Sequence, residues 1–205
     1  MDTVNLTINN KPVVVKQGTT ILEAASSVGL HIPTLCHMKL DDLNIENKPG
    51  GCRICVVEVD GRRNLAPACC TDVNDGMEIK TNTMRVLNAR RTVMELILSD
   101  HPFDCLICAK SGHCDLQDMA QDLGIREIHY KGEQSTYRPD TSPAIIREID
   151  KCIMCRRCET MCNVVHSVGV LSEINRGFDS VVSPAFEMNL DHSVCTYCGQ
   201  CVAVC

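Results

Sequence analysis

Two runs of four cysteines dominate this sequence, and both have the spacing C-x2-C-x2-C-x3-C. The first run is Cys152, Cys155, Cys158 and Cys162, and the second is Cys195, Cys198, Cys201 and Cys205. They belong to a set of 16 cysteines in 205 residues, in a chain with no tryptophan, three phenylalanines and three tyrosines. Because large apolar side chains are so scarce, we expect a group bound by the cysteines to replace part of an ordinary core.

The spacing of the two runs predicts a pair of 4Fe–4S clusters. Three thiolates of each run ligate one cluster, and the fourth cysteine ligates the cluster of the other run. One cluster is therefore expected to use Cys152, Cys155, Cys158 and Cys205, and the other Cys195, Cys198, Cys201 and Cys162. The structural alternative is a pair of zinc ribbons, which use paired C-x2-C knuckles rather than three cysteines in a row.

The rest of the sequence argues against several classes of protein. No stretch approaches the roughly 18 consecutive apolar residues of a membrane-spanning helix, and the first ten residues do not resemble a secretory signal. We therefore expect a cytoplasmic protein, in which the cysteines bind metal rather than form disulfides. The formal net charge of −6 shows no basic footprint, so nucleic acid is not an expected partner.

The first 80 residues predict a mixed α/β region. Alternation of apolar and polar residues predicts a strand over 4–8, and after a turn a second strand follows over 13–15. Thr19 or Thr20 is placed to cap a helix that runs to about residue 28 and ends at Gly29. We expect a cysteine-rich loop over 36–55 and further strands over 56–59 and 77–80.

Four cysteines of this region are expected to hold a 2Fe–2S cluster: Cys36, Cys52, Cys55 and Cys69. A C-x2-C pair with one cysteine before it and one well after it resembles the plant-type 2Fe–2S arrangement, with a longer first gap. Cys70 follows Cys69 directly, and neighbours in an extended chain point to opposite sides, so only one of the two should be a ligand. We expect that ligand to be Cys69. The ββα opening followed by a cysteine loop resembles the β-grasp fold of 2Fe–2S ferredoxins.

Between these regions lies a third group of candidate ligands. Cys105, Cys108 and Cys114 are one ligand short of a 4Fe–4S site, and we expect His101 to supply the fourth. An imidazole in place of a thiolate removes a negative charge and should raise the reduction potential, as in Rieske centres. The alternatives are that His101 only ends a helix, and that His113 or no histidine is the ligand.

Helices are expected on both sides of this third group. Apolar residues predict an amphipathic helix over 83–99 and a second helix after Cys114 that closes at Gly124. A polar connector is expected over 131–143. The predicted organisation is α+β, with a 2Fe–2S ferredoxin-like domain over 1–80, a small helical His/Cys3-ligated 4Fe–4S domain over 81–140 and a bacterial two-cluster 4Fe–4S ferredoxin-like domain over 141–205.

The ligand count is complete at one 2Fe–2S and three 4Fe–4S clusters. Four clusters need sixteen ligands, which fifteen cysteines and His101 supply, and Cys70 is left over.

The order of these motifs resembles the N-terminal electron-transfer region of iron-only (FeFe) hydrogenases, especially the NAD-linked, electron-bifurcating type. The resemblance rests on the segments 51–59, 101–108, 112–117 and 175–179 together with the two ferredoxin runs, and it covers essentially the whole chain. The chain is also similar to the diaphorase iron–sulfur subunit of NAD-reducing hydrogenases, NAD-linked formate dehydrogenases and the large iron–sulfur subunit of respiratory complex I.

The resemblance implies a module that relays electrons between a flavin/NAD(P)-binding partner and a hydrogenase catalytic domain or ferredoxin. No thiol besides Cys70 remains for a catalytic metal site, and no G-x-G-x-x-G motif marks a dinucleotide site, so we expect no catalytic residue in this chain. In the hydrogenases a catalytic domain follows this region, so the chain is either part of a longer polypeptide or a short subunit. The alternatives are a stand-alone ferredoxin-like carrier, or the same module serving an NAD(P)–ferredoxin transhydrogenase or formate dehydrogenase.

Two arginine pairs remain, Arg90-Arg91 and Arg156-Arg157. Such pairs usually lie on solvated faces, and the alternative is that they offset cluster charge or dock a partner.

Overall fold

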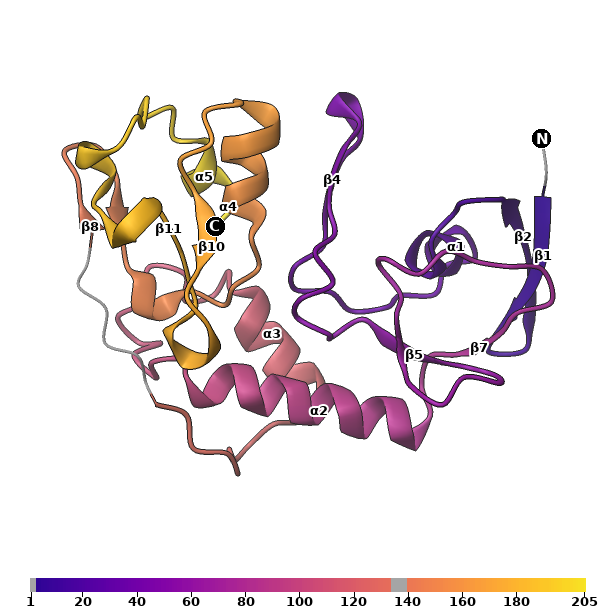
Figure 1. The fold of residues 1–205 in the computed structure, drawn as a ribbon. Coiled ribbons are helices and arrows are strands. Elements are labelled where there is room, and N and C mark those ends of the chain that lie inside the picture. Colours follow the sequence, from indigo (N-terminus) through magenta and orange to yellow (C-terminus); the bar gives the residue numbers. More distant parts are fainter. Residues whose placement is uncertain (1–2, 134–139) are drawn as a thin grey trace. The chain divides into compact units, whose positions relative to one another are not determined.

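The computed structural model describes residues 3–133 and 140–205, and the chain divides into two compact units (Figure 1). The first unit comprises Met1–Leu35, Cys52–Glu95 and Cys114–Glu127, and the second comprises Cys36–Gly51, Leu96–His113 and Ile128–Cys205. Part of the predicted polar connector, residues 134–139, lies outside the described residues. Over the described ranges, no helix combines the length and the apolar character needed to cross a membrane.

A five-stranded sheet in the order β2-β1-β7-β5-β6 forms the first unit. Its strands are β1 (Thr3–Ile8), β2 (Lys11–Lys16), β5 (Val56–Val59), β6 (Ala66–Pro67) and β7 (Glu78–Lys80). β1 pairs antiparallel with β2 and parallel with β7, and β5 pairs antiparallel with β7 and β6. The four strands predicted in this region are confirmed, and β6 is an additional short strand.

The β1–β2 hairpin follows directly from its sequence. Val4, Leu6 and Ile8 alternate along β1 and are all buried. Asn9 and Asn10 form the turn with φ of 49° and 66°, and asparagine tolerates this left-handed region better than most residues. Pro12 has no N–H to donate, which β2 accommodates because it is the edge strand of the sheet.

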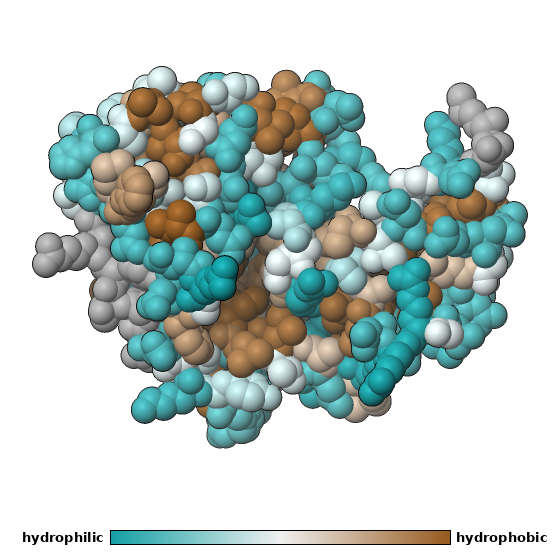
Figure 2. Space-filling model, in the orientation of Figure 1, coloured by the Kyte–Doolittle hydropathy of each residue, from teal (hydrophilic) through white to brown (hydrophobic). Residues whose placement is uncertain are grey.

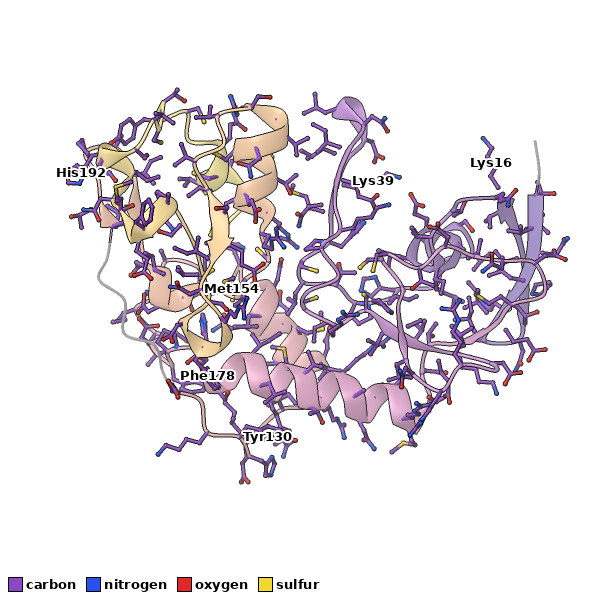
Figure 3. The ribbon with its side chains drawn as sticks, in the orientation of Figure 1. Lys16, Lys39, Tyr130, Met154, Phe178 and His192 are labelled. Carbon is purple, nitrogen blue, oxygen red and sulfur yellow. The ribbon has the colours of Figure 1, made fainter. Side chains whose placement is uncertain are left out.

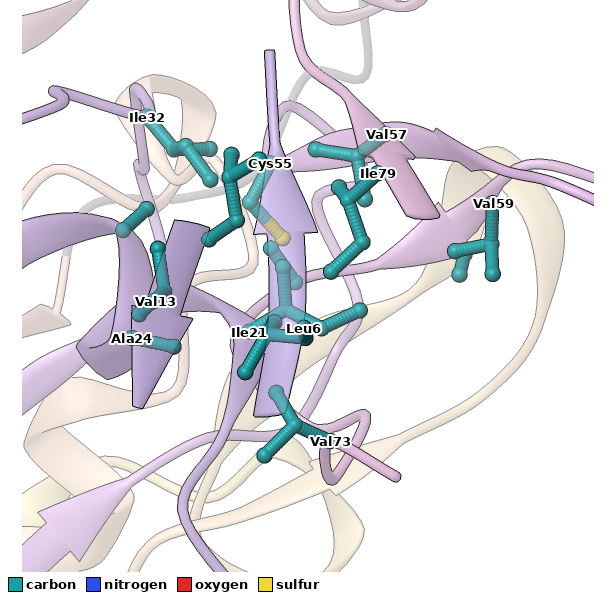
Figure 4. Close-up of a cluster of buried hydrophobic side chains, with 14 of the residues drawn as sticks. Leu6, Val13, Ile21, Ala24, Ile32, Cys55, Val57, Val59, Val73 and Ile79 are labelled. Carbon is teal, nitrogen blue, oxygen red and sulfur yellow. The ribbon is translucent and has the colours of Figure 1, made fainter. Parts of the chain in front are cut away.

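Helix α1 (Ile21–Ser27) begins with a capping box. The Thr20 hydroxyl accepts a hydrogen bond from the Glu23 N–H, and the Glu23 carboxylate accepts one from the Thr20 N–H. Gly29, with φ 72°, ends the helix as predicted. Buried side chains of α1 and the sheet form one hydrophobic core, and Cys55 and Cys69 are members of it (Figure 4).

Two longer helices confirm the helical predictions for residues 83–99 and beyond Cys114. They are α2 (Met84–Ser99) and α3 (Asp115–Asp122), and Gly124, with φ 66°, follows α3. The Thr83 hydroxyl accepts a hydrogen bond from the Val86 N–H at the start of α2. Val86, Arg90 and Met94, spaced four residues apart, are buried on one face of this helix.

The second unit begins with a hairpin where the sequence predicted only a loop. β3 (Met38–Leu40) pairs antiparallel with β4 (Ile45–Asn47), and η1 (Asp41–Leu43) and Asn44, with φ 51°, turn the chain between them. The composition of this segment is typical of turns, which hid three-residue strands too short to show a period. The prediction of a loop over 36–55 was therefore wrong for these residues.

Short elements build the remainder of the second unit. The strands are β8 (Asp140–Thr141), β9 (Ile146–Arg147), β10 (Ser172–Ile174) and β11 (Val181–Ser183), and the helices are η2 (Ile149–Lys151), α4 (Arg157–Thr160), η3 (Met161–Val165), η4 (Gly177–Asp179), η5 (Ala185–Glu187), η6 (Leu190–His192) and α5 (Gln200–Ala203). β8 pairs with β9 and β10 with β11, both antiparallel. A small apolar cluster around Leu190 packs against Cys158, Cys162, Cys195 and Cys201, so cysteines take the place of larger core residues.

Asp140 ties parts of this unit together. The residue is 2% exposed, and its carboxylate accepts hydrogen bonds from the Ser142 hydroxyl, the Arg147 guanidinium and the Leu190 N–H.

Some apolar side chains reach the surface, where Figure 2 shows brown areas among polar ones. Leu106 and Ile107, between two candidate cysteine ligands, are 100% and 85% exposed.

Candidate iron–sulfur sites

The two C-x2-C-x2-C-x3-C runs have left-handed residues at the same two positions. Met154 and Tyr197, at the same place in each run, both have φ of 54°. Each donates its N–H to the preceding cysteine, Met154 to Cys152 Sγ and Tyr197 to Cys195 Sγ, and both distances are 3.4 Å (Figure 3 labels Met154). Hydrogen bonds of this kind stabilise a negatively charged sulfur and are one of the means by which proteins tune iron–sulfur clusters.

The match extends to the position after the second cysteine of each run. Arg156 and Gly199 occupy it with φ of 60° and 74°, and the short helices α4 and α5 begin immediately afterwards. Residues with positive φ turn the backbone sharply, and such a turn allows closely spaced cysteines to point toward one site. The local geometry therefore fits the cluster-binding turn that the spacing predicts.

The thiols of the first predicted ligand set influence one another electrostatically. Burial raises the pKa of the Cys158 thiol to about 12, and the charges of Cys152, Cys155 and Cys205 contribute to the increase. Cys205 also raises the pKa of Cys155, after the larger effect of burial. Cys205, from the second run, is therefore near enough for its charge to act on Cys155 and Cys158 of the first run.

The second ligand set lines a single cavity. Cys162, Cys195, Cys198 and Cys201 share its wall with apolar side chains that include Ile145, Leu171 and Leu190. Cys162 belongs to the first run, so this cavity brings its side chain together with three cysteines of the second run. That combination is compatible with the second ligand set that the spacing predicts.

Two of the candidate 2Fe–2S ligands of the first unit belong to its hydrophobic core. Cys55 and Cys69 are 1% and 0% exposed, and their Sγ atoms are 3.5 Å apart. Cys52 is half-buried and precedes them in the same unit. Cys70 is exposed, and its Sγ lies 3.9 Å from the Pro67 carbonyl oxygen. The placement favours Cys69 over Cys70 as the ligand.

Cys36, the remaining 2Fe–2S candidate, belongs to the second unit and is 1% exposed. Its carbonyl oxygen accepts a hydrogen bond of 2.6 Å from Asn47 Nδ2, which also donates to the Cys155 carbonyl at 3.1 Å. Asn47 Oδ1 accepts a bond of 2.6 Å from the Thr160 hydroxyl. One buried amide thus connects the backbones of a candidate 2Fe–2S ligand and a candidate 4Fe–4S ligand. Sequence patterns gave no signal for this role of Asn47.

The third group is divided between the units: His101, Cys105 and Cys108 belong to the second and Cys114 to the first. Nδ1 of His101 is buried and has no hydrogen-bond partner among the described residues. Burial lowers the pKa of His101 although nearby carboxylates, Asp104 foremost, oppose it, and this shift favours the neutral imidazole that a metal requires. His113 is exposed. The residues fit a His-ligated cluster at His101 better than at His113.

A single bound metal ion is a different case from a cluster. Within residues 3–133 and 140–205, no group of three His, Cys, Asp or Glu side chains converges closely enough to hold one ion. A cluster places its ligands on separate iron atoms and so needs a wider arrangement.

Comparison with known proteins defines the nature of these sites. Residues 1–84 match a 2Fe-2S iron-sulfur cluster binding domain, and residues 90–129 match the NADH-ubiquinone oxidoreductase-G iron-sulfur binding region. The chain is an iron–sulfur protein. The mixed α/β architecture and the presence of both 2Fe–2S and 4Fe–4S binding regions are thereby confirmed.

Several proteins of known classes resemble the chain over most or all of its length. It is 63% identical over 206 residues to the NADP-reducing hydrogenase subunit HndD of Solidesulfovibrio fructosivorans, a match that covers 100% of this chain and 35% of that protein. It is 36% identical over 181 residues to the NADH-ubiquinone oxidoreductase 75 kDa subunit of Reclinomonas americana, covering 88% of this chain and 26% of that protein. The iron–sulfur chain therefore spans about a third or less of these relatives.

A solved structure shows the same fold. The NAD+-reducing [NiFe]-hydrogenase in the H2-reduced state superposes with a TM-score of 0.82 at 26% identity, covering 94% of this chain and 80% of that chain. The resemblance to iron–sulfur subunits of NAD(P)-linked hydrogenases and of NADH-quinone oxidoreductases, inferred from the motifs, is confirmed.

Proposed function

We propose that this chain relays electrons through four iron–sulfur clusters between a flavin/NAD(P)-binding partner and a second redox centre. The observation that supports the proposal most directly is the cavity lined by Cys162 of the first run together with Cys195, Cys198 and Cys201 of the second run. A pair of ferredoxin-type sites serves electron transfer rather than bond-making chemistry, and the protein sets potentials through ligand identity, hydrogen bonds and burial. When bound, the clusters would supply the centres that accept and donate electrons.

We assign the clusters as follows. The 2Fe–2S cluster is held by Cys36, Cys52, Cys55 and Cys69 in a β-grasp domain, and one 4Fe–4S cluster by His101, Cys105, Cys108 and Cys114. The two ferredoxin-type clusters are held by Cys152, Cys155, Cys158 and Cys205, and by Cys195, Cys198, Cys201 and Cys162. Within the second unit, the hydrogen bonds of Asn47 hold the segment of the proposed ligand Cys36 to that of the proposed ligand Cys155.

The partners follow from the relatives. A hydrogenase subunit and an NADH-ubiquinone oxidoreductase subunit resemble this chain, and each is by name one part of an assembly. We propose a flavin/NAD(P)-binding subunit as one partner and a hydrogenase catalytic domain or ferredoxin as the other, in an electron-bifurcating oxidoreductase. The three-domain division at residues 80 and 140 belongs to the same proposal.

The experiment that tests the cluster content is a combined chemical and spectroscopic count on anaerobically prepared protein. The proposal expects about 14 iron atoms and about 14 acid-labile sulfides per chain. EPR of the dithionite-reduced protein should show one 2Fe–2S signal and the signals of 4Fe–4S clusters. Bound zinc in place of acid-labile sulfide would refute the assignment.

The histidine ligand has a matched control in the same segment. His101→Ala should remove one 4Fe–4S signal and leave the 2Fe–2S signal, whereas His113→Ala should leave every signal in place. Retention of all signals in His101→Ala would exclude His101 as a ligand.

A further inference from the structure

Arg90 is a buried cation next to the proposed 2Fe–2S site. Only 5% of the residue is exposed, and it lies on α2 between Val86 and Met94, which are 0% exposed. Its Nη2 donates a hydrogen bond of 2.9 Å to the carbonyl oxygen of Val56, the residue after Cys55. Its Nε is buried and has no hydrogen-bond partner in the described part of the chain.

Among residues 3–133 and 140–205, no Asp or Glu side chain forms an ion pair with Arg90. Cys55 is the charged group that raises its pKa. Burial lowers the pKa of Arg90 and Cys55 raises it. A guanidinium nevertheless keeps its proton in proteins, so the positive charge remains.

A buried charge without a partner is strongly unfavourable, so proteins that retain one generally pair it with an opposite charge. A 2Fe–2S cluster with four thiolate ligands is an anion, and reduction adds one more negative charge. A fixed cation nearby therefore stabilises the reduced cluster more than the oxidised cluster, and the low dielectric of the interior strengthens this effect.

We propose that Arg90 is the buried counter-cation of the 2Fe–2S cluster and that it raises the reduction potential of that cluster. The inference rests on the proposed function, because it requires a cluster bound by Cys55 and its companion ligands. Arg90 acts as a positioning and potential-setting residue and is not itself a ligand.

The neighbouring residue offers a matched control. Arg91 carries the same charge on the same helix, but it is exposed, and its Nε donates to the Leu123 carbonyl oxygen at 2.9 Å. Solvent and salt screen the charge of an exposed group, so Arg91 should affect the cluster much less than Arg90.

The test is a redox titration of the 2Fe–2S EPR signal in the cluster-loaded protein, read at a temperature at which 4Fe–4S signals have broadened. In Arg90→Gln, the ratio of reduced to oxidised cluster at a fixed potential should fall about tenfold, equivalent to a midpoint about 59 mV lower for one electron. Arg91→Gln should leave the midpoint near that of the unsubstituted protein. Equal midpoints in all three proteins would overturn the inference.

A charge-retaining variant separates charge from packing. Arg90→Lys should keep the midpoint closer to the unsubstituted value than Arg90→Gln does, and a midpoint equal to that of Arg90→Gln would overturn the inference. Should Arg90→Gln lose the cluster, its retention in Arg90→Lys would still support a charge role, and its loss in both would overturn it.

The same titration distinguishes this inference from the function on which it rests. An unsubstituted protein without any 2Fe–2S signal would overturn the proposed function and the inference together. A normal signal with an unchanged midpoint in Arg90→Gln would overturn the inference alone.

Discussion

Replacing Asn47 by alanine should loosen the attachment of the Cys36 segment to the ferredoxin-like part of the second unit. Asn47 is 4% exposed and makes three side-chain hydrogen bonds, to the carbonyls of Cys36 and Cys155 and to the Thr160 hydroxyl. Alanine keeps the backbone and removes all three bonds. The two carbonyl oxygens and the Thr160 hydroxyl then lose these hydrogen bonds, and the alanine side chain offers no replacement.

The size of the effect follows from those bonds. Each contributes about 1 kcal/mol net, so the free energy of unfolding should fall by about 3 kcal/mol, and by more if the abandoned carbonyls remain dry. With a urea dependence of about 2 kcal/mol per molar, the unfolding midpoint should fall by about 1.5 M. Asn47→Asp, nearly the same size, should lose at least as much, because a carboxylate cannot donate to the two carbonyls.

The assay is urea unfolding under anaerobic conditions, followed by far-ultraviolet circular dichroism and by the visible absorbance of the clusters. All proteins are incubated for the same time, so that they remain comparable where cluster release makes unfolding irreversible. Asn88→Ala is the control, since Asn88 is exposed on α2 and should change stability by less than about 0.5 kcal/mol. A midpoint for Asn47→Ala equal to that of the control would refute the reasoning.

The remaining predictions concern single side chains. Burial raises the pKa of Glu46, but hydrogen bonds, led by the one from Lys48, outweigh this effect. The net pKa is therefore below the ordinary 4.5. Its charged form therefore stabilises the fold above pH 4.5, and this stability is lost as the pH falls through the lowered pKa. Urea midpoints measured at a series of pH values below 4.5 should therefore depend less on pH in Glu46→Gln than in the unsubstituted protein. Gly199→Ala should lower the free energy of unfolding by about 1–2 kcal/mol in the same assay, because the φ of Gly199 is 74°. No neighbour lies within 4 Å of an added Cβ, so this backbone strain would account for the whole effect. Cys69→Ser should abolish the 2Fe–2S EPR signal and Cys70→Ser should preserve it, and the opposite result would reverse the choice of ligand.

Much of the first unit could be predicted because its sequence signals are local. Period-two alternation marked β1, and the Thr20–Glu23 capping box and Gly29 marked both ends of α1. The ferredoxin runs carry a local signal of the same kind, since a gap of two residues restricts where neighbouring thiolates can point, and the grouping of their cysteines stays a prediction. In these places the information lies within a few residues of the element it determines.

The features that escaped prediction depend on partners far apart in the sequence. In the sequence, Arg90 interrupts an apolar stripe and resembles a solvated residue of a charged pair. In the structure it is buried, and its guanidinium donates to the carbonyl oxygen of Val56, which lies 34 residues earlier in the chain. Asn47 lies in a segment with a turn-like composition, and its partners Cys155 and Thr160 are more than 100 residues away. No local pattern records such contacts, because only the tertiary fold brings the groups together.

The scarcity of large apolar residues acquires a physical meaning in the second unit. Its apolar cluster is small, and half-buried cysteines pack where larger side chains would otherwise lie. Without a cluster, burial holds the Cys158 thiol protonated at neutral pH, with its pKa at about 12. Cluster binding requires thiolates, so it must release protons and becomes more favourable as the pH rises. Because the unfolded chain has no preformed site, the binding free energy of a cluster held by these cysteines would contribute directly to the free energy of folding.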